Sequence, residues 1–295
     1  MRDKLEYYSV KMFITFLGFL PNHIIYKTLK LISKLTYKLE KRRSSLTRKN
    51  LKTVFPNLNT KEIDKLALEA YESVAVTLAE IILMLNNKLD LDSMVTNKEE
   101  FLEKMKRYDS SSEKGLIVIT AHFSNWELAA QFLPKYGFPM TAIGREGNNK
   151  LIEKSITTPF RERYGNKNIY KKKAMISIIK ALKKGGRVGL LIDQKASGKN
   201  SVKVKFFNLE ADTINSVAVL KLKYNPTVLP IFAIRDKNGK YKIEIKEPVE
   251  YIAEETEDEN EKIKRMTQKY NDILEEVIKE YPTQWFWMHN RWRLV

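Results

Sequence analysis

Residues 116–131 are the stretch that most constrains the fold, because they combine a buried strand, a turn and the start of a helix. The stretch reads LIVITAHFSNWELAAQ. Residues 116–119 are a short, mostly β-branched run, which is typical of a strand buried on both faces. Residues 124–127 have the pattern of a helix start. His122 is therefore predicted to lie on the turn between the strand and the helix.

His122 and Glu127 are five positions apart, and this spacing decides whether they can meet. Inside one helix, two side chains five residues apart would point about 140° away from each other. With His122 outside the helix, Glu127 in the first turn can reach back to it. A carboxylate on one imidazole nitrogen fixes the tautomer and stabilises the imidazolium, which leaves the other nitrogen free to take a proton from a hydroxyl. The pair predicts general-base catalysis of acyl transfer without an enzyme nucleophile.

A structural interpretation of the same residues stays open at this point. Ser124 and Glu127 fit a capping box, in which Ser124 caps the helix and the Glu127 carboxylate binds the backbone amide of the cap. Glu127 would then be structural. His122 could likewise be a turn histidine whose polar atoms are satisfied by the backbone.

Short apolar runs alternate with helical patterns along most of the chain. This alternation predicts an α/β fold with a largely parallel central sheet flanked by helices. In such sheets the functional site lies at the carboxyl ends of the strands. His122 and Asp193 both follow strand ends, so they could meet although they are far apart in sequence. Beyond residue 116, helices are expected at 126–136, 150–164, 173–184 and 262–279, and strands at 140–143, 168–170 and 188–192.

The first 50 residues carry an excess of nine positive charges and an apolar run, MFITFLGFL, at residues 12–20. Nine apolar residues cannot span a bilayer, which needs about twenty. Apolar residues continue to Leu35 with lysines between them, a pattern typical of a helix that lies on a membrane surface. We therefore expect a membrane-associating helical segment at residues 1–45 and one domain at 46–295. The alternative is a helix that simply packs on the domain.

The net charge and the cysteine and histidine content limit which partners and cofactors the protein could use. The net charge of +17 favours anionic partners, and anionic lipids fit the basic N-terminus. Nucleic acid is not expected, because no helix-turn-helix, zinc-finger or RNP-like pattern is present. The chain has no cysteine and only three dispersed histidines. This excludes disulfides, a thiolate nucleophile and a cysteine-ligated metal, and it argues against a histidine-rich metal site.

The motif AHFSNWE at residues 121–127 resembles the His-x-x-x-x-Asp/Glu motif of the glycerolipid acyltransferase superfamily. With Glu at its end and Asn-Trp inside, it is similar to the late acyltransferases of lipid A biosynthesis, the lauroyl/myristoyl acyltransferase family. One departure from the family pattern is Lys150 after Asn149, where the family usually has Pro. Further blocks resemble the family in the same order: NLKTVFPNL (50–58), GREGNNKLIEK (144–154), RERYG (161–165), KALKKGGRVGLLIDQ (180–194), VKVKFF (202–207), VLPIF (228–232) and PTQWFWMHNRWR (282–293).

The resemblance implies a glycerol-3-phosphate acyltransferase-like fold and a membrane enzyme. Its reaction would transfer a fatty acyl chain from acyl carrier protein, or from acyl-CoA, to a hydroxyl of a lipid A precursor. The reaction implied by this resemblance requires no metal or cofactor. The place would be the cytoplasmic face of the bacterial inner membrane. In this interpretation His122 is the general base, and Glu127 orients it. Arg145 and Arg161 match the arginine block and would bind substrate phosphate or the oxyanion, and Asp193 would orient an arginine.

Two other functions remain to be weighed against this one. A related membrane acyltransferase could use acyl-CoA to modify another glycolipid or glycerolipid. A non-catalytic peripheral membrane protein could retain the same fold, although the intact His122 and Glu127 pair argues against it.

Overall fold

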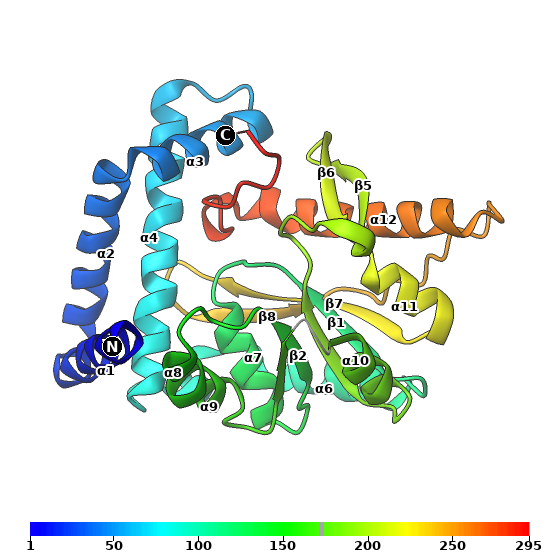
Figure 1. Cartoon of the computed structure of the whole chain (residues 1–295), viewed down its shortest axis with the longest axis horizontal. Helices are drawn as coiled ribbons and strands as arrows, with labels where there is room; N and C mark the ends of the chain where they lie inside the picture. The colour runs from blue at the N-terminus through cyan, green and yellow to red at the C-terminus, as the bar shows by residue number, and fades with distance from the viewer. Residues whose placement is uncertain (171–173, 295) are drawn as a thin grey trace.

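The computed structural model describes residues 1–170 and 174–294, and at its centre lies a six-stranded sheet in the order β3-β2-β4-β1-β7-β8. Neighbouring strands are parallel except for β7 and β8, so the predicted largely parallel sheet is confirmed. A separate antiparallel hairpin, β5–β6, stands beside it (Figure 1). The strands are β1 (Leu116–Thr120), β2 (Thr141–Gly144), β3 (Lys167–Tyr170), β4 (Arg187–Leu191), β5 (Ser201–Phe206), β6 (Leu209–Ile214), β7 (Thr227–Arg235) and β8 (Tyr241–Ile245).

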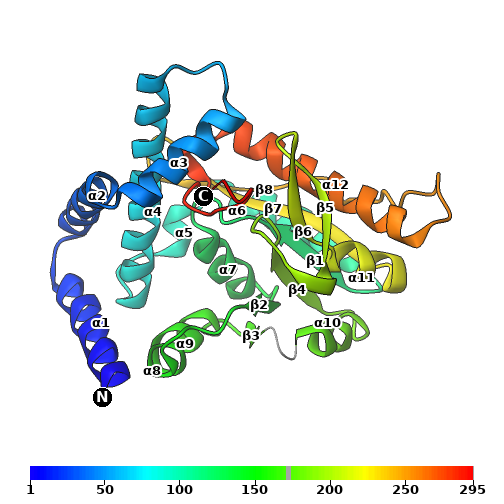
Figure 2. The same ribbon diagram turned by 45° about the horizontal axis from the view of Figure 1, so that its top comes forward.

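Helices cover both faces of the sheet and extend to one side of it (Figure 2). The start expected at residue 173 for the third predicted helix lies outside the described residues. The last helix begins earlier than predicted because Asp258 caps it by accepting from the backbone of Asn260 and Glu261. The α-helices are α1 (Arg2–Phe19), α2 (Asn22–Leu39), α3 (Lys41–Val54), α4 (Thr60–Leu85), α5 (Leu91–Met94), α6 (Lys98–Ser110), α7 (Trp126–Lys135), α8 (Lys150–Ile152), α9 (Thr158–Arg161), α10 (Ala174–Leu182), α11 (Ser216–Tyr224) and α12 (Glu259–Glu280).

Successive side chains of β1 point to opposite faces of the sheet, and the core on each face forms its own layer. Ile117 and Ile119 point into a cluster that includes residues of α10, α11 and α12. Leu116 and Val118 point into a second cluster that includes residues of α6 and α7. Successive side chains of a strand face opposite sides of a sheet, so a continuous apolar strand requires cover on both sides. The backbone of β1 is thereby held rigidly between two layers, and its carboxyl end is a fixed platform.

The predicted helix at 150–164 is wrong in part, because the segment is broken. It consists of α8, a π-helical turn at Glu153–Thr157, and α9, which ends at Arg161. Pro159 lies in the first turn of α9. Proline has no N–H to continue the hydrogen-bond ladder, and π turns often mark such interruptions.

The N-terminal helices pack along α4 (Figure 1). Leu17 of α1 and Ile25 and Leu29 of α2 are buried with four residues of α4: Ala75, Ala79, Ile82 and Leu83. The opposite side of α1 is open, with large apolar side chains such as Met12 and Phe19 exposed by 72% and 83%. Among the described residues, no helix has the length and apolar character required to cross a bilayer.

Candidate active site

The parallel pairing of β1 with β4 brings His122 and Asp193 together at the carboxyl edge of the sheet. Thr120 of β1 lies opposite Leu191 of β4, so the residues just past the two strand ends are neighbours. Nδ1 of His122 lies 2.9 Å from Oδ1 of Asp193. The Asp193 side chain is 1% exposed, whereas that of His122 is 26% exposed. The predicted meeting of these two residues is confirmed.

The environment of this pair favours the charged form of both side chains. Burial alone would lower the pKa of His122, but the charge of Asp193 and its hydrogen bond outweigh burial and raise that pKa above 6.5. Burial would raise the pKa of Asp193, yet the His122 charge and the hydrogen bonds from His122 and Trp285 hold it below 3.8. Asp193 is thus a buried carboxylate that stabilises an imidazolium. Within the described part of the chain, Nε2 of His122 has no protein partner, so in the neutral imidazole this nitrogen is open to take a proton.

Glu127 does not occupy the position that the sequence predicts for it. Its carboxylate forms a forked ion pair with Arg161, with Oε1 2.6 Å from Nη2 and 3.2 Å from Nε. The expected pairing is therefore corrected: the carboxylate that contacts Nδ1 of His122 is that of Asp193, and the carboxylate of Glu127 pairs with Arg161. Glu127 lies close enough for its charge to raise the pKa of His122. Its side chain reaches α9 from the first turn of α7, and the start of α7 is fixed by another residue.

That residue is Asn125, so the capping box between Ser124 and Glu127 is also wrong. The Asn125 side chain accepts from the backbone N–H of Leu128 and donates from Nδ2 to Glu80. Ser124 has a φ of 51°, in the left-handed region that non-glycine residues rarely adopt. Backbone strain of this kind persists only where surrounding contacts fix it, and it is often found at functional sites.

The contacts that fix Ser124 come from two sides. Its backbone N–H donates to the carbonyl of Gln284 at 2.6 Å. Its carbonyl accepts from the hydroxyl of Thr77, on α4, at 2.9 Å. The backbone of residues 122–124 is therefore clamped between α4 and the C-terminal segment.

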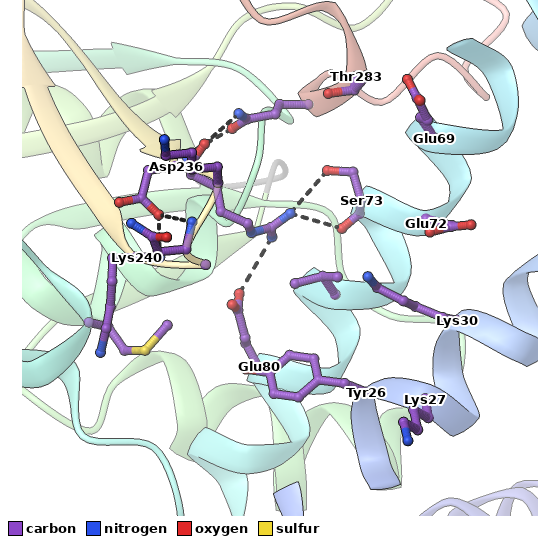
Figure 3. A pocket seen from close by; sticks show the side chains of 17 residues that line it. Tyr26, Lys27, Lys30, Glu69, Glu72, Ser73, Glu80, Asp236, Lys240 and Thr283 are labelled. Carbon is purple, nitrogen blue, oxygen red and sulfur yellow. Dashed lines mark hydrogen bonds and ion pairs between the residues drawn. The ribbon is translucent and has the colours of Figure 1, made fainter. Parts of the chain in front are cut away.

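A buried polar network supports the Thr77 side of this clamp. Glu80 is 1% exposed, and its Oε2 accepts from Asn125, Tyr241 and Arg235. Arg235 also donates to Ser73 and Thr77. Ser73, Glu80 and Arg235 of this network line a pocket of about 820 Å³ between α2, α4 and the turn after β7, with Lys30 directed into it (Figure 3). The sequence pattern gave no indication of this network.

The C-terminal segment, residues 282–292, contributes the other side of the clamp. It also contacts the Asp193 carboxylate directly. The N–H of Phe286 donates to the carbonyl of His122 at 3.0 Å. Nε1 of Trp285 donates to Oδ2 of Asp193 at 2.8 Å. Nε2 of His289 accepts from the N–H of Lys195, and burial lowers the pKa of His289, which favours its neutral form. The resemblance of this segment to a family signature was the one signal that could have pointed to Trp285.

The two predicted arginines differ in their placement. Arg161 is 31% exposed and belongs to the cluster with Glu127 and His122. Arg145 is exposed at the carboxyl end of β2, and its nearest side-chain partner is Asn148 at 3.5 Å. Among the described residues, no group of three or more His, Asp or Glu side chains could hold a metal ion. The arrangement therefore combines a histidine, a buried carboxylate that contacts it and an adjacent guanidinium.

Comparison with known proteins agrees with the motif. A model of the bacterial lipid A biosynthesis acyltransferase family matches residues 2–294. The chain is 31% identical to a lipid A biosynthesis palmitoleoyltransferase of Escherichia coli over 258 residues, 86% of this chain and 79% of that protein. It is 27% identical to a lipid A biosynthesis lauroyltransferase of Escherichia coli, over 93% of this chain and 87% of that protein.

A lipid A biosynthesis acyltransferase of Haemophilus influenzae is also 27% identical, over 87% of this chain and 79% of that protein. The family model covers nearly the whole chain, including the segments that carry His122, Arg161 and Asp193. The chain therefore belongs to the bacterial lipid A biosynthesis acyltransferase family and is an acyltransferase.

Proposed function

We propose that this protein transfers a fatty acyl chain from the thioester of acyl carrier protein to a hydroxyl of a lipid A precursor, with His122 as the general base. The observation that carries the proposal is the His122–Asp193 pair, with one ring nitrogen held by a buried carboxylate at 2.9 Å and the other open. Relatives that are named for palmitoleoyl and lauroyl transfer in lipid A biosynthesis support the substrate class.

The proposed reaction needs one base and no covalent enzyme intermediate. Nε2 of His122 takes the proton of the acceptor hydroxyl while its oxygen bonds to the thioester carbonyl carbon. The Asp193 carboxylate stabilises the imidazolium that forms. The tetrahedral intermediate collapses with cleavage of the carbon–sulfur bond, and the thiolate that leaves takes the proton back from His122. The products are an ester and a free thiol.

Arg161 is the proposed stabiliser of negative charge in this reaction. Its Nε and Nη2 are committed to Glu127, which fixes the plane of the guanidinium. Among the described residues, Nη1 has no such ion pair and lies near Gly144, at the carboxyl end of β2. A fixed guanidinium beside the base suits a developing oxyanion or a substrate phosphate. Arg145, exposed on the same sheet edge, is the proposed second contact for a phosphate.

The N-terminal helices are the proposed membrane contact, at the cytoplasmic face of the inner membrane. Most of the large apolar side chains that are exposed in the described residues belong to α1 and α2. Lys27, Lys30, Lys34 and Lys38 of α2 add positive charge, which attracts anionic headgroups. The net charge of +17 would also attract an acidic donor protein.

Mass spectrometry of lipid A tests the proposed substrate class. Cells that lack the protein should accumulate a lipid A precursor that is lighter by one acyl chain than the product in cells that contain it. Purified protein should then add that chain to the precursor when supplied with acyl-carrier-protein thioester. Identical lipid A masses, together with acylation of another glycolipid, would contradict the proposal and favour a different acceptor.

A further inference from the structure

The C-terminal segment places one indole against the carboxylate that holds the proposed base. Asp193 has two oxygens: Oδ1 lies 2.9 Å from His122, and Oδ2 accepts from Nε1 of Trp285 at 2.8 Å. Asp193 and Trp285 are each 1% exposed, so no bulk water replaces this donor. A buried carboxylate oxygen without a donor is unfavourable, so the orientation of Asp193 is set by both partners.

Trp285 is held in this position through its backbone as well as its ring. Residues 123 and 285 form an antiparallel β-bridge, so the segment lies directly along the loop that carries His122. The ring packs in an aromatic cluster, with centroid distances of 4.7 Å to Trp287 and 5.6 Å to Phe206. The indole therefore presents a fixed N–H to Asp193 rather than a mobile one.

We propose that Trp285 is a positioning residue that acts through Asp193 and sets the basicity of His122. Its N–H stabilises part of the negative charge on the carboxylate, and this weakens the electrostatic attraction between Asp193 and the imidazolium of His122. Without that donor, the negative charge of Asp193 stabilises the His122 imidazolium more strongly. The imidazolium then becomes harder to deprotonate. The inference rests on the proposed role of His122 as base, and it adds a residue from the far end of the chain to the determinants of that role.

The test removes the N–H and keeps the shape of the ring. Full-length protein carries β-(3-benzothienyl)alanine at position 285, in which sulfur replaces the N–H of tryptophan. The pKa of His122 is measured by NMR titration of its imidazole, with the resonance assigned by its loss in His122→Ala. We expect the midpoint to rise by about half a pH unit or more. An unchanged or lowered midpoint overturns the proposal.

Trp292 provides a matched control. It belongs to the same aromatic cluster and is 9% exposed, but its Nε1 donates to the backbone carbonyl of Phe206. The same replacement at position 292 should leave the His122 midpoint unchanged, and an equal shift there would mean a general effect of disturbing the cluster. Since the titration requires no turnover, it is separate from the proposed function, which fails instead if folded His122→Ala transfers acyl chains normally.

Discussion

At the scale of single residues, the candidate site is a histidine whose two ring nitrogens have different environments. Nδ1 faces the buried Asp193, and Nε2 has no protein partner among the residues that the structure describes. In catalytic histidines, a carboxylate at one ring nitrogen commonly fixes the tautomer and leaves the other nitrogen to exchange a proton. The consequence for this protein is a pKa above the ordinary value of histidine, and this can be measured as a pH dependence.

The rate of acyl transfer should rise with pH through a midpoint above 6.5, because only neutral His122 can accept a proton. In Asp193→Asn the charge that raises the pKa of His122 is lost while burial still lowers it. The midpoint should therefore move to lower pH, and the maximal rate should fall because the imidazolium loses its stabilising charge. Kinetics at saturating donor across pH 5 to 9 check both effects, and an unmoved midpoint in this variant would exclude Asp193 as the partner.

Arg161→Lys keeps the charge but cannot form the forked pair with Glu127, so the cation loses its fixed position. If Arg161 stabilises the oxyanion, transfer should fall by about 10²-fold, the usual cost of losing such a donor. Arg163→Lys is the matched control, because Arg163 is exposed and its guanidinium donates to the backbone carbonyl of Met84 rather than to a carboxylate. Equal rates for the two variants would make Arg161 a structural residue.

At the scale of elements, the start of α7 connects the helix to the site. Asn125 caps the helix and also donates to the buried Glu80. Asn125→Ala should lower the free energy of unfolding by about 1 to 3 kcal/mol, because a cap and a partner of a buried carboxylate are lost together.

Asn59→Ala serves as the comparison in chemical denaturation, because Asn59 caps α4 in an exposed capping box. It should cost about 1 kcal/mol or less and leave transfer unchanged. Equal losses in the two variants would mean that the contact with Glu80 contributes nothing.

The elements that could be predicted from the sequence are those defined by local pattern. The apolar run at 116–119 indicates a buried strand, and the order of strands and helices indicates a parallel sheet, which places His122 and Asp193 at one edge. The break at Pro159 has a local cause and could have been predicted from the proline.

The pairing within the site could not be predicted in this way. Glu127 binds Arg161 rather than His122 because α9 lies beside α7, and no local pattern gives that placement. Asp193 meets Trp285 across 92 positions through the path of the C-terminal segment. Helix α7 begins at residue 126 as predicted, but its cap is Asn125 rather than Ser124, which adopts a left-handed conformation.

At the scale of the whole molecule, the N-terminal helices pack on α4 with one side and expose large apolar side chains on the other. One side of α1 packs on α4, so removal of the helix would expose the apolar surface of α4 as well. The membrane proposal is therefore better tested by point substitution. Met12→Glu, at a position 72% exposed, should weaken flotation of the full chain with anionic vesicles, because it places a charge in the apolar face.

Ile176→Glu on α10 is the control, since Ile176 is 70% exposed on another part of the molecule. It should not change vesicle binding. Raised salt should weaken the binding of the unaltered protein if the lysines of α2 contribute to it. Equal flotation of both variants and the unaltered protein would mean that α1 does not contact the membrane.

The measurement that tests the central claim most directly is the rate of acyl transfer by His122→Ala with purified donor and acceptor. His122 is partly exposed, so its removal should leave the fold intact, which circular dichroism and thermal unfolding can verify. Loss of a positioned general base predicts a fall of at least about 10²-fold in the rate. A folded variant that transfers the acyl chain at a rate close to that of the unaltered protein would contradict the account.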